Sequence, residues 1–277
     1  MLSDDYSDAA LLLIGHGSTQ NRASEKPVFQ HAAEIRRRRI FHEVREGFWK
    51  QEPKIATVLQ GITTPRVFIV PLFISEGYFS EQVIPQSLGF SLGADPASRT
   101  RSDGRRTIHY CRLVGTHSSL TQVLLARARG VVAQFPFPRA PKPTDITLFI
   151  AGHGTPQSDE SRRSVDEQAQ RIRNLNEYAA VHSIFMEEEP RIHQCYSLAG
   201  TRNMVVVPFF ISDGMHTEED IPVMLGEAER LVRDRIATGQ PPWRNPTERN
   251  GKLVWYASAV GTESTLADVI IERVKEL

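Results

Sequence analysis

Cysteine is scarce in this sequence of 277 residues, which contains only Cys111 and Cys195. Two cysteines cannot complete a four-thiolate zinc site or hold an iron–sulfur cluster within one chain. They are also too few for the disulfide framework that small secreted domains use in place of a large core. The composition therefore excludes three classes of protein that depend on cysteine.

The sequence also lacks a long hydrophobic run and an excess of charge of either sign. No segment approaches the roughly 18 apolar residues that a membrane-spanning helix needs. The start, MLSDDYSDAALLLIGHGS, is acidic around the short run LLLI, whereas a secretory signal has a basic start and a longer apolar stretch. Lys plus Arg and Asp plus Glu each number 33, which gives no attraction to nucleic acid or to an anionic membrane. We expect a cytoplasmic protein that binds neither.

Several catalytic motifs are missing as well. The sequence has no G-x-G-x-x-G, no Walker A loop and no H-E-x-x-H. Ser18 and Thr155 have no G-x-S-x-G elbow around them. A histidine phosphatase needs an arginine directly before its His-Gly, and here Gly15 and Gly152 occupy that place. These absences argue against dinucleotide-dependent, P-loop, zincin and phosphohistidine chemistry.

What the chain does contain is an internal repeat. LLLIGHGS near the start matches LFIAGHGT in the middle, at an offset of 137 residues. At the same offset PLFISEGYFSEQVIP (71–85) matches PFFISDGMHTEEDIP (208–222), with 8 identities in 15 positions. RLVGTHSSL later matches SAVGTESTL at an offset of 146, so the second copy carries nine extra residues, which we expect in the loop 241–250. Blocks that match in one order indicate a duplicated domain.

Each copy has the pattern of an α/β domain. ALLLIG and TLFIAG are continuous apolar runs that end in glycine, and RVFIVPLFI and MVVVPFFI are rich in β-branched and aromatic residues, as buried parallel strands are. Helical patterns follow, among them residues 120–133 and 266–277. We predict two similar doubly wound parallel-sheet domains of about four or five strands each. Their predicted bounds are 1–135 and 145–277, with a stiff linker at prolines 136, 138, 141 and 143.

The G-H-G turns follow the first predicted strand of each copy. Ligands of doubly wound sheets bind beyond the carboxyl ends of the strands, and glycines let a ligand approach the backbone. A single histidine in such a place is commonly structural. The recurrence of His16 as His153 at the ligand edge favours a functional role.

The Glu-Pro steps, Glu52-Pro53 and Glu189-Pro190, also recur at this edge. Each glutamate either caps the short helix that follows or offers a carboxylate at the mouth of the site. The second copy is the more acidic here. At matched positions it has Glu187 for Lys50 and Glu188 for Gln51.

The copies differ two residues after the glycine of the S-E-G and S-D-G turns, where the second copy has His216 and the first has Phe79. His153, His216 and Glu189 follow different strands and can converge at one edge, so we predict that they are the catalytic and metal-binding residues. Two imidazoles and a carboxylate suit a divalent first-row metal and supply bases near neutral pH. The first copy then shapes the cleft, although its aromatic residues can equally be core. The candidate substrate-binding residues are His16, Glu52, Tyr78, Phe79, Ser212 and Gly214.

These motifs together resemble a known family. The strand followed by GHGS, the E-P step and the pattern V-P-x-F-[IL]-x-x-G-x-H…D-I-P look like the class II tetrapyrrole chelatases. The similarity is greatest to the sirohydrochlorin cobaltochelatases of the CbiX type in their long, duplicated form, and it covers essentially the whole chain. The two family histidines fall on His153 and His216, and the family glutamate on Glu189, with Glu187 as its rival. Phe79 departs from the pattern, which leaves one complete site per chain.

The resemblance implies an enzyme that inserts a divalent metal, without ATP, into a tetrapyrrole held between two α/β domains. The metal ion is then a substrate, Co²⁺ first and Fe²⁺ or Ni²⁺ as alternatives, and no cofactor is permanently bound. The expected partner is the tetrapyrrole, in a monomer or homodimer of this chain. Two other functions stay open. They are a non-catalytic tetrapyrrole- or metal-binding protein on the same fold, and a hydrolase that uses the G-H-G histidines without added metal.

Overall fold

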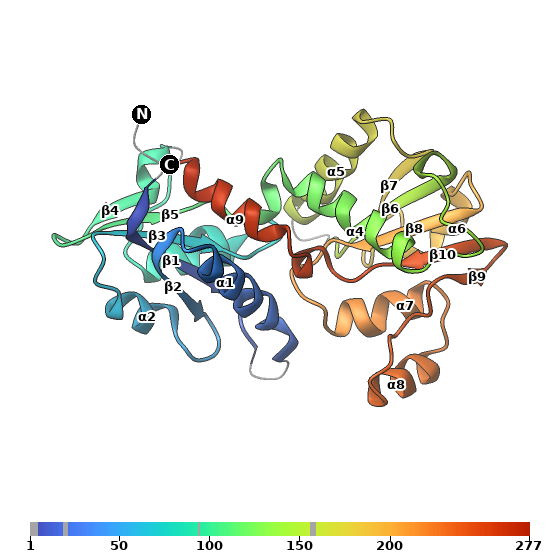
Figure 1. Cartoon of the computed structure of the whole chain (residues 1–277), viewed down its shortest axis with the longest axis horizontal. Coiled ribbons are helices and arrows are strands. Elements are labelled where there is room, and N and C mark those ends of the chain that lie inside the picture. The colour runs from blue at the N-terminus through green and yellow to red at the C-terminus, as the bar shows by residue number, and fades with distance from the viewer. Residues whose placement is uncertain (1–4, 19–21, 94, 156–158) are drawn as a thin grey trace. The chain divides into compact units, whose positions relative to one another are not determined.

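The chain forms two α/β units, seen in the computed structural model of Figure 1. The structure describes residues 5–18, 22–93, 95–155 and 159–277. Unit 1 comprises residues 1–117 and 264–277, and unit 2 comprises residues 118–263. In the part of the chain that is described, no helix is long and apolar enough to cross a membrane.

The sheet of unit 1 has five strands in the order β2-β1-β3-β5-β4. The first four are parallel, and the short edge strand β4 is antiparallel to β5. The strands are β1 (Tyr6–Gly15), β2 (Phe41–Phe48), β3 (Arg66–Pro71), β4 (Thr100–Ser102) and β5 (Thr107–Tyr110). The helices are α1 (Lys26–Arg38), α2 (Ile55–Gly61), α3 (Ile84–Ser87) and α9 (Leu266–Lys275). A π-helical turn, Phe79–Val83, precedes α3.

Unit 2 repeats this design with the order β7-β6-β8-β10-β9, again with an antiparallel edge strand. The strands are β6 (Ile146–Gly152), β7 (Ala180–Phe185), β8 (Asn203–Pro208), β9 (Thr247–Arg249) and β10 (Lys252–Tyr256). The helices are α4 (Leu120–Gln134), α5 (Asp159–Asn174), α6 (Cys195–Leu198), α7 (Ile221–Met224) and α8 (Glu229–Ala237). A π-helical turn, His216–Asp220, precedes α7. The predicted pair of doubly wound sheets is confirmed, with the antiparallel edge strand as an added detail.

The central strands contain continuous buried apolar runs, such as Ala9–Ile14 in β1, because both faces of each sheet are covered. In β1, Leu12 and Ile14 pack against Ile55 and Leu59 of α2 on one face, all of them buried. The other face is covered by α1 and α9. This packing fixes where the strands end, and therefore where the turns at the carboxyl edge begin.

The compact units differ from the predicted domains 1–135 and 145–277 by an exchange of their last helices. Helix α4 belongs to unit 2, where Arg127 donates to Thr262 Oγ1 at 2.9 Å. Helix α9 belongs to unit 1, where Arg273 donates to Thr116 Oγ1 at 2.8 Å and to the Leu113 carbonyl at 2.8 Å. Arg127 and Arg273 occupy matched positions in the repeat, and so do Thr262 and Thr116. Helix α4 of the first copy therefore bonds to the second copy, and α9 of the second copy bonds to the first.

The extra residues of the second copy also lie in a different place from the predicted loop 241–250. Part of that stretch forms strand β9, the counterpart of β4. The second copy instead has helix α8, Glu229–Ala237, before its edge strand. At the corresponding place unit 1 has only the short 3₁₀ turn Pro96–Arg99. Gly239, Pro241 and Pro242 are typical of a loop, and they directed the prediction away from the amphipathic stretch that precedes them.

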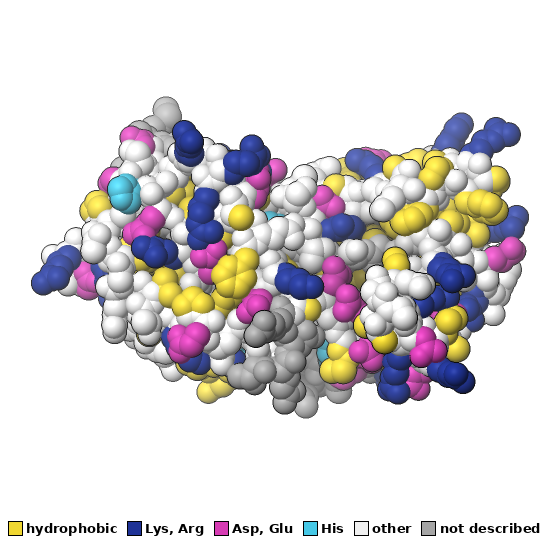
Figure 2. All heavy atoms as spheres, turned by 60° about the horizontal axis from the view of Figure 1, so that its bottom comes forward, with side chains coloured by type: hydrophobic (Ala, Val, Ile, Leu, Met, Phe, Trp, Pro, Cys, Tyr) yellow, Lys and Arg dark blue, Asp and Glu magenta, His cyan; other side chains and the backbone are white. Residues whose placement is uncertain are grey.

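Side chains of both charge signs are interspersed over the face of the molecule that Figure 2 shows. Among the described residues, many of them form ion pairs, such as Arg36 with Glu46 in unit 1 and Arg235 with Glu227 in unit 2. The described part of this face therefore has no patch of a single charge sign, in addition to the net charge of zero.

Candidate functional site

His153 is held at the end of strand β6 by its two glycine neighbours. A Cβ on Gly152 would lie 2.5 Å from Val165 Cγ2, so helix α5 leaves room only for glycine there. Gly154 has a φ of 66°, a left-handed conformation that other residues adopt at a cost. The imidazole Nδ1 lies 2.6 Å from the Gly154 carbonyl oxygen, which can only accept. Nδ1 is therefore the donor, and in the neutral tautomer Nε2 holds the lone pair.

His216 begins the π-helical turn that follows strand β8. Its Nδ1 lies 2.7 Å from Asp220 Oδ2, four residues further on. A carboxylate only accepts hydrogen bonds, so Nδ1 of this ring is the donor too, and in the neutral tautomer Nε2 holds the lone pair. π-helical turns are rare and occur often at functional sites.

The structure brings these two histidines together. Their ring centroids are 5.1 Å apart and their planes are nearly perpendicular, at 78°. Strands β6 and β8 are neighbours in the parallel sheet, so their carboxyl ends lie side by side. Two imidazoles, each with its Nδ1 bonded and its Nε2 available, form a site that can hold a proton or a metal ion.

The carboxylate beside this pair belongs to Glu187. Its Oε1 lies 3.9 Å from His153 Nε2. After β7 the chain bends back so that the amides of Met186 and Glu187 both donate to the His153 carbonyl, at 3.0 and 3.1 Å. This bend sets Glu187 next to the imidazole.

Glu189, which the sequence favoured, points elsewhere. Its side chain is 70% exposed and its Oε1 lies 3.7 Å from Arg191 Nε. Neither Glu-Pro glutamate is a helix cap, since the N-caps of the following helical turns are Lys54 and Arg191. Among the described residues, no three His, Cys, Asp or Glu side chains already stand as a group that could hold a metal ion.

The corresponding edge of unit 1 has the same turns and different side chains. His16 Nδ1 lies 3.0 Å from the Gly17 carbonyl, as His153 does from Gly154. Phe79 takes the place of His216, with its ring edge-on to His16 at 5.4 Å. Burial lowers the pKa of His16, and the positive charge of Lys50 lowers it further, against the opposing effect of the hydrogen bond to Gly17. His16 is therefore a neutral imidazole at neutral pH.

The other residues predicted to bind substrate lie in these same turns. Tyr78 is 66% exposed and Phe79 40% exposed, so neither is ordinary core. Glu52 accepts the backbone N–H of Lys54 at 2.9 Å. In unit 2, Ser212 is half-buried, and Gly214 exchanges hydrogen bonds with Thr217. Gly214 therefore shapes the turn before His216.

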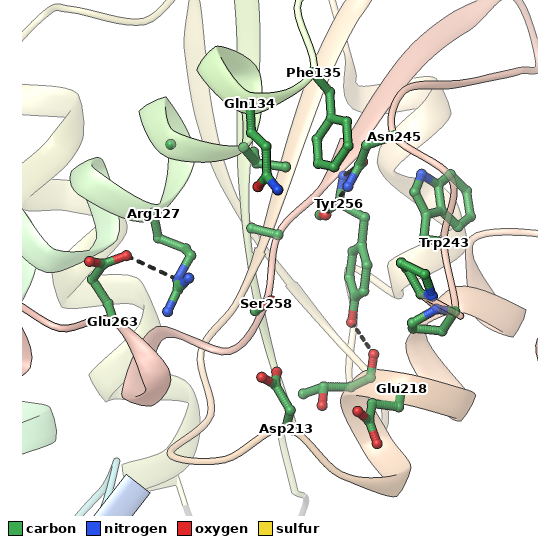
Figure 3. A pocket seen from close by; sticks show the side chains of 16 residues that line it. Arg127, Gln134, Phe135, Asp213, Glu218, Trp243, Asn245, Tyr256, Ser258 and Glu263 are labelled. Carbon is green, nitrogen blue, oxygen red and sulfur yellow. Dashed lines mark hydrogen bonds and ion pairs between the residues drawn. The ribbon is translucent and has the colours of Figure 1, made fainter. Parts of the chain in front are cut away.

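A cavity of about 350 Å³ lies in unit 2 beside the turn that carries His216 (Figure 3). Thr217 and Glu218 of the turn line it, together with Arg127 of α4 and Trp243. Tyr256 crosses it and donates from its hydroxyl to the Thr217 carbonyl at 2.6 Å. None of the residues predicted from the sequence lines this cavity. In the sequence, Trp243 in the longer segment of the second copy was a feature that could have indicated this cavity.

The known proteins that resemble this chain fix its family. The CbiX family model matches the chain twice, over residues 10–131 and 147–277. The chain belongs to the CbiX family. The two matches confirm the duplication and the resemblance drawn from its motifs, and they make the chain a metal-chelatase enzyme of the CbiX type.

Two curated relatives show this at different lengths. A probable sirohydrochlorin cobaltochelatase of Halobacterium salinarum is 39% identical over 275 residues, which covers 95% of this CbiX chain and 90% of the relative. A sirohydrochlorin cobaltochelatase of Methanopyrus kandleri is 30% identical over 139 residues, which is 47% of this chain and 96% of that protein.

Solved structures share the fold. A multi-domain Deinococcus radiodurans protein described as structurally similar to chelatases matches with a TM-score of 0.77 and 26% identity, over 96% of this CbiX chain and 54% of that chain. The sirohydrochlorin chelatase SirB of Bacillus subtilis, solved in complex with cobalt, matches with a TM-score of 0.62 over 97% of this chain and 94% of its own. Its identity is 18%, which is evidence for the fold alone.

Proposed function

We propose that this CbiX-family chain inserts a divalent metal ion into sirohydrochlorin or a related tetrapyrrole, without ATP, at the His153–His216 pair of unit 2. The observation that carries the proposal is the 5.1 Å separation of two imidazoles whose Nδ1 atoms are both engaged in hydrogen bonds, which leaves both Nε2 atoms for a ligand. The names of the relatives supply the tetrapyrrole, and the duplicated family match supplies the reaction class.

The residues suit the chemistry of metal insertion. A free tetrapyrrole carries two pyrrole N–H protons that must leave as the metal enters, and an imidazole Nε2 can accept such a proton. The same lone pairs can hold the incoming ion. A set of two imidazoles leaves several coordination positions open, in contrast to a closed structural site, so the ion can be passed on to the ring nitrogens.

The carboxylate in this proposal is Glu187 in place of Glu189. Glu187 lies 3.9 Å from His153 Nε2, whereas Glu189 pairs with Arg191. A negative charge at that distance favours the approach of a dication and stabilises an imidazolium after proton transfer.

The unit 1 residues His16, Glu52, Tyr78 and Phe79 are proposed to bind the substrate and to take no part in proton transfer. Tyr78 and Phe79 are exposed aromatic side chains, suited to a flat macrocycle. At the matched position of Tyr78, unit 2 has Met215, which is 60% exposed and equally apolar. Of the predicted pair in unit 2, Ser212 stays a proposed contact, and Gly214 acts through the turn.

The metal proposed is Co²⁺, because the relatives from Halobacterium salinarum and Methanopyrus kandleri carry cobaltochelatase names. Imidazole and carboxylate ligands also accept Fe²⁺ and Ni²⁺, so these ions are the competitors. A chloroplast relative from Arabidopsis thaliana, 26% identical over 46% of this chain, is a sirohydrochlorin ferrochelatase.

The decisive experiment incubates the anaerobic protein with sirohydrochlorin and Co²⁺ and follows the absorbance change of insertion. The His216→Ala variant should lose insertion, and the matched His16→Ala variant should keep the chemical step. Insertion that survives in His216→Ala and fails in His16→Ala would move the site to unit 1. Tight macrocycle binding with no insertion of Co²⁺, Fe²⁺ or Ni²⁺ would favour the carrier function.

A further inference from the structure

The His216 imidazole is bonded to a charged group, whereas the other two edge histidines bond to backbone. His153 and His16 each donate to the carbonyl of the glycine that follows them. His216 donates to the carboxylate of Asp220 at 2.7 Å. A hydrogen bond from Nδ1–H to a carboxylate fixes the orientation of an imidazole and makes its other nitrogen a better electron-pair donor.

The hydrogen bonds that shape the turn run through other groups. Tyr256 donates to the Thr217 carbonyl at 2.6 Å from strand β10. Gly214 N–H donates to Thr217 Oγ1 at 2.9 Å. Asp213 accepts the backbone N–H of Ala259 at 2.7 Å and so holds the segment between β8 and the π-helical turn. The side chain of Asp220 is 38% exposed, and its hydrogen bond is made to the imidazole.

The first copy shows that the turn forms without this carboxylate. Residues Phe79–Val83 make the same π-helical turn, and Tyr110 donates to the Ser80 carbonyl at 2.8 Å as Tyr256 does to Thr217. The matched positions of His216 and Asp220 are Phe79 and Val83. Histidine and carboxylate are therefore absent together where the scaffold is kept, which ties Asp220 to the imidazole and not to the backbone.

We propose that Asp220 is a positioning residue for His216, which aims Nε2 at the incoming metal ion and strengthens its donation. This inference rests on the proposed metal insertion and names the residue through which His216 acts. The side chain touches the imidazole and not the substrate, so its effect should fall on the handling of the metal ion.

The test compares Asp220→Ala, Asp220→Asn and the control Glu219→Gln, which changes a charge in the same turn. Insertion into sirohydrochlorin is measured against Co²⁺ concentration, Co²⁺ binding is titrated by absorbance without the macrocycle, and thermal unfolding reports the fold. Asp220→Ala should raise KM for Co²⁺ and weaken the titrated Co²⁺ affinity about 10- to 100-fold. Asp220→Asn keeps an acceptor oxygen and should lose less, and Glu219→Gln should match the parent.

Each outcome decides the proposal. Unchanged KM and Co²⁺ affinity in a folded Asp220→Ala protein would overturn it, and so would an equal loss in Glu219→Gln. Should Asp220→Ala fail to fold, the same comparison is made with Asp220→Asn, where a weaker metal affinity supports the role and parental affinity refutes it. Should the parent protein insert no metal, the proposed function fails on its own, and the Co²⁺ titration still tests Asp220.

Discussion

The carboxyl edges of the two units share their backbone turns and differ in their side chains. Both have a histidine between glycines, a π-helical turn and a tyrosine that bonds to that turn. The differences lie in side chains of the turns at this edge. The matched pairs, unit 1 first, are Phe79 and His216, Val83 and Asp220, Lys50 and Glu187, and Gln51 and Glu188. The two edges therefore share one backbone design and differ in charge and in the second histidine.

The largest expected difference between the two edges is in the effect of removing one histidine from each. His153→Ala should lower the insertion rate by about 100-fold or more, the range expected for loss of a positioned acid–base group. His16→Ala should change KM for the macrocycle and leave kcat near the parental value. Initial rates over both substrate concentrations measure this. An equal fall in kcat for the two variants would mean that the edges are equivalent.

The charge difference between Glu187 and Lys50 is expected to have the next largest effect. An exposed charge about 4 Å from its partner contributes about 1 kcal/mol in water, which corresponds to about fivefold in affinity. Glu187→Gln should raise KM for Co²⁺ by about that factor, and Glu189→Gln, which removes a charge paired with Arg191, should not. The reverse result would restore Glu189 as the functional carboxylate.

A third prediction converts one edge into the other. The triple variant Lys50→Glu, Phe79→His, Val83→Asp gives unit 1 three of the four side chains in which the edges differ, next to a π-helical turn like that of unit 2. The number of Co²⁺ ions bound per chain should rise from one to two in an anaerobic titration. A stoichiometry of one in a folded triple variant would show that further residues distinguish the edges.

The smallest expected effect is a loss of folding stability at acidic pH. Burial lowers the pKa of His16 and His109 in unit 1 and of His182 in unit 2 below the ordinary value of 6.5. These imidazoles bind fewer protons in the folded chain than in the unfolded chain, so they add stability above pH 6.5 and this stability is lost as the pH falls below it. Thermal unfolding at pH 7.5 and 5.5 should show lower stability in acid, and His182→Gln should reduce the difference. A stability that is flat over this range would contradict the prediction.

The sequence alone predicts the fold well because buried parallel strands leave long apolar runs, and because the repeat displays each run twice. The meeting of His153 and His216 could be predicted too, since they follow neighbouring parallel strands. Which glutamate lies beside His153 could not be predicted, because this depends on the bend after Phe185, where two amides donate to one carbonyl. The exchange of α4 and α9 was equally hidden, since an amphipathic pattern does not say which of two similar sheets a helix covers.

That exchange has a consequence for how the chain acquires its structure. Unit 2 is one continuous stretch, residues 118–263, whereas unit 1 is closed by α9, more than 140 residues after the rest of it. On the ribosome, where segments fold in the order in which they emerge, unit 2 has all its parts before unit 1 does. Until α9 is made, the face of the unit 1 sheet that α1 and α9 share is covered by α1 alone among the described helices. Helix α9, which is made after the whole of unit 2, therefore completes the sheet that contains β1.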